Sequence, residues 1–147
     1  MLPIMTHRFA RAIVLGTVLI FCVLLPLASR AAPNEIEFTD QIIGNGPEPR
    51  RGWFAIIRYT GWIYDASKPE SKGTKFDSTD DHDPITFRLG NGEVIPGWDR
   101  GLEGMRVGGK RRLVIPPDLG YGAEGTPGGP IPPNAGLVFD IELADVK

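Results

Sequence analysis

Apolar and polar residues alternate in several short runs from about residue 34 to the end of the chain. The clearest run is Leu137–Leu143, where every second residue is apolar and two acidic residues fall on the opposite face, as in a strand that borders a core. Ile85–Leu89 has the same period and is followed by Asn91-Gly92, a strong turn signal. Three further strands are expected, at Asn34–Ile43, Trp53–Tyr64 and Arg112–Ile115.

One segment has the spacing of a short helix. The large apolar residues of Pro96–Met105 recur at offsets of four and seven and so share one helical face. The polar segment Asp65–Lys75 is expected to be a loop, and Thr60-Gly61 is expected to mark a bulge or bend within its strand. About five antiparallel strands and one helix predict a single α+β domain in which the helix covers one face of the sheet.

The first 31 residues differ from the rest and predict a secretory signal peptide. Arg8 and Arg11 precede the uncharged apolar stretch Ala12–Leu27, and small residues follow it, so cleavage is expected after Ala31. The alternative is an uncleaved membrane anchor, although this stretch is shorter than the about 17–25 residues of a spanning helix. The single cysteine lies in the leader, so the domain over residues 34–147 has no thiol and needs no disulfide chemistry in an oxidising compartment.

The charge balance argues against a nucleic-acid partner. Removing the three leader arginines from the 16 basic residues leaves 13 against 18 acidic ones, a net charge of −5. Binding to phosphates needs a clustered positive surface. The run Lys110–Arg112 is too short for one and is expected on a solvated strand edge.

Three strings resemble chemical motifs but lack a required part. Gly120–Gly125 matches the dinucleotide fingerprint, yet neighbouring prolines forbid the strand and the helix that must flank it. Gly104–Lys110 begins like a phosphate-binding loop, but Arg111 stands where a Mg-binding Ser or Thr belongs. Asp77–Asp83 has the alternating spacing of a calcium loop without its glycine or its closing Glu, so a solvated acidic loop is favoured over a calcium-binding surface domain. No metal and no cofactor are expected.

The distinctive feature of the chain is a set of aromatic and apolar residues next to turns. Of the two histidines, His7 lies in the leader, and no Ser-His-Asp constellation can be assembled around His82. The domain has no Cys for a thiol mechanism. Large apolar residues usually belong to the core, but here they occur within six ordered strings. These are Tyr59-Thr60-Gly61, Lys75-Phe76-Asp77-Ser78, Glu93-Val94-Ile95-Pro96-Gly97-Trp98, Gly120-Tyr121-Gly122, Ile131-Pro132-Pro133-Asn134-Ala135 and Leu137-Val138-Phe139-Asp140. Together they resemble the FKBP family of peptidyl-prolyl cis-trans isomerases, and the resemblance runs from about Glu35 to the C-terminus.

The resemblance implies a bent antiparallel sheet wrapped over one short helix, with a proline pocket between the helix and the concave face. Trp98 would form the pocket floor, and the Ile95 backbone N–H would be available to a substrate carbonyl. Asp77 and Tyr121 would be the catalytic polar residues at the rim. The other implied substrate-binding residues are Tyr59, Phe76, Phe87, Val94, Ile131 and Phe139. In this sequence Ile85 stands where a second pocket Phe is common, and the Arg that often pairs with the pocket Asp has no clear counterpart.

The resemblance further implies that the pocket isomerises X-Pro bonds in unfolded or exported proteins, and that macrolide inhibitors are additional ligands. The leader predicts secretion, with a bacterial periplasm as the expected compartment, or attachment to the inner membrane facing the periplasm if the leader is retained. A non-catalytic peptide-binding chaperone or scaffold with the same fold is the alternative function.

Overall fold

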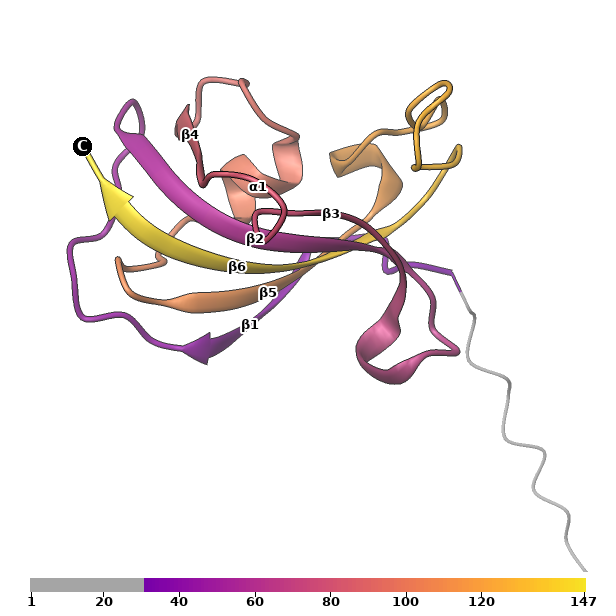
Figure 1. Cartoon of the computed structure of the whole chain (residues 1–147), viewed down its shortest axis with the longest axis horizontal. Helices are drawn as coiled ribbons and strands as arrows, with labels where there is room; N and C mark the ends of the chain where they lie inside the picture. The colour runs from indigo at the N-terminus through magenta and orange to yellow at the C-terminus, as the bar shows by residue number, and fades with distance from the viewer. Residues whose placement is uncertain (1–30) are drawn as a thin grey trace, which may run out of the picture.

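Six strands form one open antiparallel sheet (Figure 1). The order across the sheet is β1 (Glu37–Ile42), β5 (Lys110–Ile115), β6 (Leu137–Val146), β2 (Phe54–Tyr64) and β3 (Lys72–Ser78), while β4 (Ile85–Arg88) pairs with β2 off this path. The structure, a computed structural model, describes residues 31–147, so the predicted leader lies outside the described residues except for Ala31. The predicted α+β class with an antiparallel sheet is confirmed.

The strand β6 lies at the centre of the sheet, and its alternation of apolar and polar residues predicted it from the sequence. It pairs with β5 on one side and with β2 on the other. Its alternating apolar residues Leu137, Phe139, Ile141 and Leu143 are all buried, as predicted. Every second side chain therefore enters one core, and the site described below is built on this face of the sheet.

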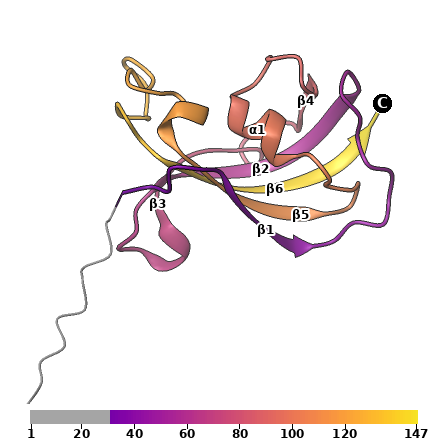
Figure 2. The same cartoon turned by 180° about the vertical axis from the view of Figure 1, so that it is seen from behind.

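Within residues 31–147 one short α-helix, α1 (Pro96–Gly101), lies on the concave side of the sheet, as both views show (Figures 1 and 2). Its backbone approaches β5 closely, because a Cβ atom on Gly97 would lie 2.6 Å from side-chain carbons of Ile115. The segment Pro96–Met105 holds a short helix, as predicted, and this helix ends at Gly101. Gly104 has a φ of +71°, outside helical geometry, and Met105 still packs in the core. Two 3₁₀ turns, η1 (Pro69–Ser71) and η2 (Pro117–Leu119), complete the elements.

The strand β3 was not predicted, and the loop expected over Asp65–Lys75 is wrong for its last four residues. β3 pairs with β2 along its length, but the register shifts between Gly61 and Trp62 and again before Tyr64. The first shift lies at the predicted Thr60-Gly61 irregularity. Because Gly61 pairs with Asp77 and Trp62 pairs with Lys75, the extra residue is Phe76 on β3.

The run Lys110–Arg112 was expected on a solvated sheet edge, and this is wrong for Arg111. The strand β5 lies between β1 and β6, and Arg111 is only 4% exposed. Its guanidinium donates to Asp40 of β1, with an Nε–Oδ1 distance of 2.6 Å, and to the carbonyls of Gly101 and Glu103 at 2.8 Å each. This side chain therefore joins the first strand to the end of α1.

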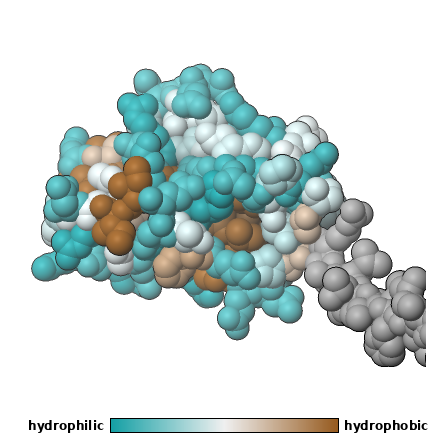
Figure 3. Space-filling view, turned by 90° about the horizontal axis from the view of Figure 1, so that it is seen from below, coloured by the Kyte–Doolittle hydropathy of each residue, from teal (hydrophilic) through white to brown (hydrophobic). Residues whose placement is uncertain are grey.

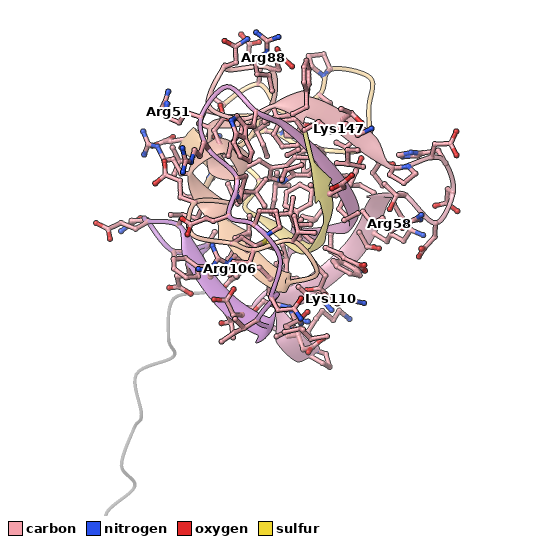
Figure 4. All side chains as sticks on the ribbon, turned by 90° about the vertical axis from the view of Figure 1, so that its left-hand side faces the viewer. Arg51, Arg58, Arg88, Arg106, Lys110 and Lys147 are labelled. Carbon is pink, nitrogen blue, oxygen red and sulfur yellow. The ribbon has the colours of Figure 1, made fainter. Side chains whose placement is uncertain are left out.

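The six basic side chains that Figure 4 labels do not gather into one patch in that view. The labelled side chains of Arg51, Arg58, Arg88, Arg106, Lys110 and Lys147 are spread around its periphery. Arg112 and Lys72 instead form an ion-pair network with Asp140 and Glu70, with N–O distances between 2.7 and 2.9 Å. The face seen from below is mostly hydrophilic with apolar areas between (Figure 3).

Candidate functional site

An open cavity of about 440 Å³ lies where α1 meets the strands. This volume falls within the roughly 300–1,000 Å³ of small-ligand sites. Its walls come from β2, β3, β4, α1, β6 and the loops before α1 and after β5. They are Tyr59, Phe76, Asp77, Ile85, Gly92, Glu93, Val94, Ile95, Trp98, Tyr121 and Phe139.

Trp98 projects from α1 and is the most buried aromatic ring of the cavity apart from Phe139. The edge-to-face contacts of its ring fix its orientation: its centroid lies 4.8 Å from that of Tyr59 and 5.2 Å from that of Phe139. The indole Nε1 is buried and has no hydrogen-bond partner among residues 31–147. Packing alone therefore holds this ring in place.

Phe76 occupies the extra position in β3, and a glycine makes room for its ring. The Phe76 and Phe139 rings meet at right angles with centroids 5.6 Å apart. A Cβ atom on Gly61 would lie 2.6 Å from the Phe76 ring and 2.8 Å from the Phe139 ring. The bulge and the missing side chain at residue 61 together place Phe76 in the cavity wall.

Two residues implied by the resemblance do not line this cavity. Phe87 is 4% exposed and lies behind the floor, with its ring centroid 6.0 Å from that of Trp98. Ile131 is 4% exposed in the core, and its backbone N–H donates to Thr126 Oγ1 at 2.9 Å. Both support the lining instead of forming it.

Three lining residues were not in the implied set: Ile85, Gly92 and Glu93. The sequence carried a signal for Ile85, which stands at a position where a pocket Phe is common in the family. Glu93 is fixed by its own contacts, because its carboxylate accepts from the Arg88 backbone N–H and from the Asn91 side chain at 2.9 Å each. It follows the Asn91-Gly92 turn directly, a spacing that could have indicated it.

Two hydrogen-bond donors face the cavity without an internal acceptor. Ile95 is the residue before α1, and its backbone N–H makes no hydrogen bond within residues 31–147. The Tyr121 hydroxyl likewise has no partner there, and the residue is 41% exposed. Burial, followed by the negative charge of Asp77, raises the pKa of Tyr121, so its hydroxyl keeps its proton at neutral pH.

Asp77 is the charged residue at the rim, and three donors surround it. The Tyr59 hydroxyl donates to Oδ2 in a short hydrogen bond, and the Ser78 backbone N–H donates to Oδ1 at 2.9 Å. The third group is His82, whose Nε2 lies 3.4 Å from Oδ1. The sequence left the partner of Asp77 unidentified, and the structure places Tyr59 and His82 in that role.

These contacts determine the ionisation states of Asp77 and Tyr59. Burial raises the pKa of Asp77, but the hydrogen bonds from Tyr59, Ser78 and His82 together outweigh burial and hold this pKa below its usual value. Burial and the bond to Asp77 raise the pKa of Tyr59 well above its usual value. At neutral pH the site therefore contains a carboxylate and a neutral phenol.

The arrangement supports binding and polarisation more than bond-breaking chemistry. Within residues 31–147 no group of three or more His, Cys, Asp or Glu side chains is placed to hold a metal ion. No helix in the same part of the chain is long and apolar enough to cross a membrane. The cavity offers aromatic walls, one fixed carboxylate and two free donors, which suits a small apolar ring next to a polar carbonyl.

Comparison with known families agrees with this geometry. Residues 46–144 match the family described as FKBP-type peptidyl-prolyl cis-trans isomerase. The chain belongs to this family. The match runs from the loop before β2 into β6 and so contains every residue of the cavity.

Individual members of the isomerase family resemble the chain over most of its length. A protein of Neisseria meningitidis serogroup B, called FK506-binding protein, is 49% identical over 104 residues, which are 70% of this chain and 88% of that protein. FK506-binding protein 4 of Dictyostelium discoideum is 46% identical over 111 residues, which are 76% of this chain but 28% of that protein. The chain thus spans only about a quarter of this second relative.

The fold is also that of a solved structure. The crystal structure of AtFKBP13 superimposes with a TM-score of 0.66 at 40% sequence identity, and covers 80% of this chain and 98% of that one. The FKBP-like fold implied by the six strings is therefore confirmed.

Proposed function

We propose that this FKBP-type chain catalyses cis-trans isomerisation of X-Pro bonds by binding the prolyl ring against Trp98 in the cavity. The observation that carries the proposal is the cavity itself: a floor and walls of aromatic rings with two unpaired donors at its edge. A prolyl ring is apolar and carries no N–H, so an aromatic floor without a required acceptor suits it.

Such a cavity accelerates rotation by changing the surroundings of the amide. Rotation about an X-Pro bond takes tens to hundreds of seconds at room temperature, because the partial double bond is lost in the transition state. The planar amide is more dipolar than the twisted one, so water favours the ground state. Transfer into an apolar cavity removes that preference and lowers the barrier, with no bond made or broken.

The polar rim acts on the geometry of the twisted amide. A carbonyl that swings out of plane can accept from the Ile95 N–H or from the Tyr121 hydroxyl, which line the cavity and have no acceptor within residues 31–147. The negative charge of Asp77 acts on the nearby Tyr121 hydroxyl. The Asp77 carboxylate is itself held by the hydrogen bond that it accepts from Tyr59. Its lowered pKa leaves it ionised at neutral pH, so it does not supply a proton.

We further propose that the substrates are proline-containing segments of exported proteins. Support for this comes from the leader-like segment before the domain, which predicts secretion to a bacterial periplasm or attachment to the membrane that faces it. Members of this family bind proline-containing peptides and FK506-type ligands, so a macrolide is the expected competitor for the cavity.

The test is an isomerisation assay with X-Pro peptides varied at X, comparing the natural chain with Trp98→Phe. This substitution removes no hydrogen bond, because the Trp98 Nε1 has no partner within residues 31–147. The smaller ring leaves the floor incomplete, so we expect KM to rise several-fold, the effect of about 1 kcal/mol of lost contact. Equal activity of the two proteins would remove the cavity from consideration.

A second measurement separates catalysis from the alternative, peptide holding. An isomerase accelerates the slow refolding phase of a proline-limited protein at substoichiometric concentration. A non-catalytic chaperone would suppress aggregation of the same protein without changing that rate.

A further inference from the structure

The loop between β3 and β4 brings an imidazole to the rim of the cavity. His82 Nδ1 lies 2.8 Å from the backbone carbonyl oxygen of Asp83, and its Nε2 lies 3.4 Å from Asp77 Oδ1. The ring also meets Tyr59 edge-on, with centroids 6.2 Å apart. The side chains of His82 and Asp77 are 41% and 44% exposed, so solvent protons reach both.

Both ring nitrogens of His82 face groups that can only accept a hydrogen bond. A backbone carbonyl has no proton to give, and neither has an ionised carboxylate. A neutral imidazole carries one N–H, so it can satisfy one of these two acceptors and turns a lone pair toward the other. Only the imidazolium, with two N–H groups, donates to both Asp83 and Asp77.

We propose that protonated His82 positions the Asp77 carboxylate, and that this contact makes catalysis in the cavity depend on pH near neutrality. The inference rests on the proposed function, and it adds a positioning residue to it. The shorter contact, to Asp83, retains the single proton of the neutral ring. Loss of the second proton therefore breaks the contact to Asp77 and leaves its orientation to Tyr59 and Ser78 alone.

The surroundings of His82 favour its charged form. The hydrogen bond with the Asp83 carbonyl raises the pKa of His82 above its usual 6.5. Burial acts in the opposite direction. The carboxylates of Asp77 and Asp81 raise this pKa further, so it stays above the usual value. The charged and titratable groups around the ring are Asp77 on β3, Tyr59 on β2, Asp81 and Asp83 in the loop, and Lys75, which pairs with Asp81 at 3.1 Å.

The expected direction of the effect follows from charge. An imidazolium offsets the negative potential of Asp77 at the cavity mouth, where the substrate must bring its partly negative carbonyl oxygen. Deprotonation leaves the carboxylate less compensated and less fixed. We expect kcat/KM to fall about two- to fivefold as the pH rises through the pKa of His82, the size of effect that one exposed ion pair produces.

The first experiment measures the contact without any activity assay. NMR titration of the full chain, with the His7 and His82 signals distinguished by the spectrum of His82→Gln, gives the pKa of His82. We expect Asp77→Asn to lower this pKa, whereas Glu37→Gln, on the edge strand β1 at the other end of the sheet path from β2 and β4, leaves it unchanged. An unchanged pKa in Asp77→Asn would overturn the inference.

The second experiment measures kcat/KM from about pH 5.5 to about pH 8.5 with an X-Pro peptide that has no titrating group in this range. The natural chain and the matched control His7→Gln should both lose activity as the pH rises. His82→Arg should stay at the upper level and His82→Gln at the lower level across the range, because neither side chain titrates there.

The outcomes separate the two proposals. Inactivity of the natural chain at every pH would contradict the proposed function. An active natural chain whose profile is as flat as that of His82→Gln would overturn the role of His82 and leave the isomerase function standing.

Discussion

Most side chains of the cavity could be predicted from the sequence, but the contacts between them could not. The walls were readable from the sequence because aromatic residues next to turns occur in distinctive strings. The contacts among them were not, since the approach of His82 to Asp77 depends on the conformation of a polar loop with no period of its own. Phe87 and Ile131 were expected to line the cavity but are buried behind its wall. A sequence motif identifies the residue type at a position, but it does not tell whether the side chain faces the cavity or the core.

At Tyr121 we expect the hydroxyl to matter for turnover and not for folding. The Tyr121→Phe variant keeps the ring and removes a donor that has no partner within residues 31–147, so the free energy of unfolding should change by less than about 0.5 kcal/mol. The value of kcat should fall about two- to tenfold, as for one neutral hydrogen bond made in the transition state. Urea unfolding and isomerisation kinetics test the two parts separately. A larger change in KM than in kcat would contradict this role.

The elements of the fold depend on backbone pairing that the apolar pattern reveals only in part. The strand β6 was predicted because its core-facing residues alternate. The strand β3 was missed because Phe76 is its only large apolar residue, and an edge strand held by backbone hydrogen bonds needs no apolar period. The burial of Arg111 was missed because one acceptor, Asp40, is distant in the sequence, and the two nearer ones are backbone carbonyls of Gly101 and Glu103, which have no sequence signature.

The β2–β3 bulge should be sensitive to one added methyl group at Gly61. In Gly61→Ala the new Cβ would lie 2.6 Å from the Phe76 ring, so both that ring and Phe139 must move and the cavity wall deforms. We expect a loss of about 1–3 kcal/mol of stability together with weaker peptide binding. Adding Phe76→Leu removes the obstructing ring, so the double variant should be more stable than the sum of the single changes predicts. Additive free energies of unfolding would contradict the predicted clash.

The Arg111–Asp40 contact should make stability depend on acid pH. Arg111 lowers the pKa of Asp40 chiefly through its hydrogen bonds, so the contact stabilises the fold at pH above the unfolded value of about 4 and is lost as the pH falls through the lower folded value. In Arg111→Met the stability at neutral pH should drop by about 2–4 kcal/mol, because Asp40 and two carbonyls lose a donor. Its stability should then change less between neutral and acid pH than that of the natural chain. Urea unfolding at several pH values measures this, and parallel pH curves would exclude the contact as a cause.

The part of the chain that the structure describes combines one sheet, one α-helix and a cavity assembled from segments far apart in the sequence. Because the cavity needs β2, β3, β6 and α1 at once, it exists only in the folded domain. The segment that joins the domain to the predicted leader is part of the same packing. Ala32 lies against Gly136, since a Cβ atom on Gly136 would be 2.3 Å from that of Ala32.

This contact bears on the predicted removal of the leader. Cleavage after Ala31 requires an accessible, extended segment, whereas the next residue already packs on the folded domain. We therefore expect cleavage to precede folding. Mass spectrometry of the protein recovered from a bacterial periplasm should show a chain that begins at Ala32, and Ala31→Leu should block the cut because a large residue replaces a small one at the cleavage site. Purified full-length chain that has already folded should be cut more slowly by signal peptidase than the same chain unfolded in urea and then diluted into the reaction. Recovery of the natural chain intact in the membrane fraction would instead identify residues 12–27 as an anchor, with the isomerase domain held at the membrane surface.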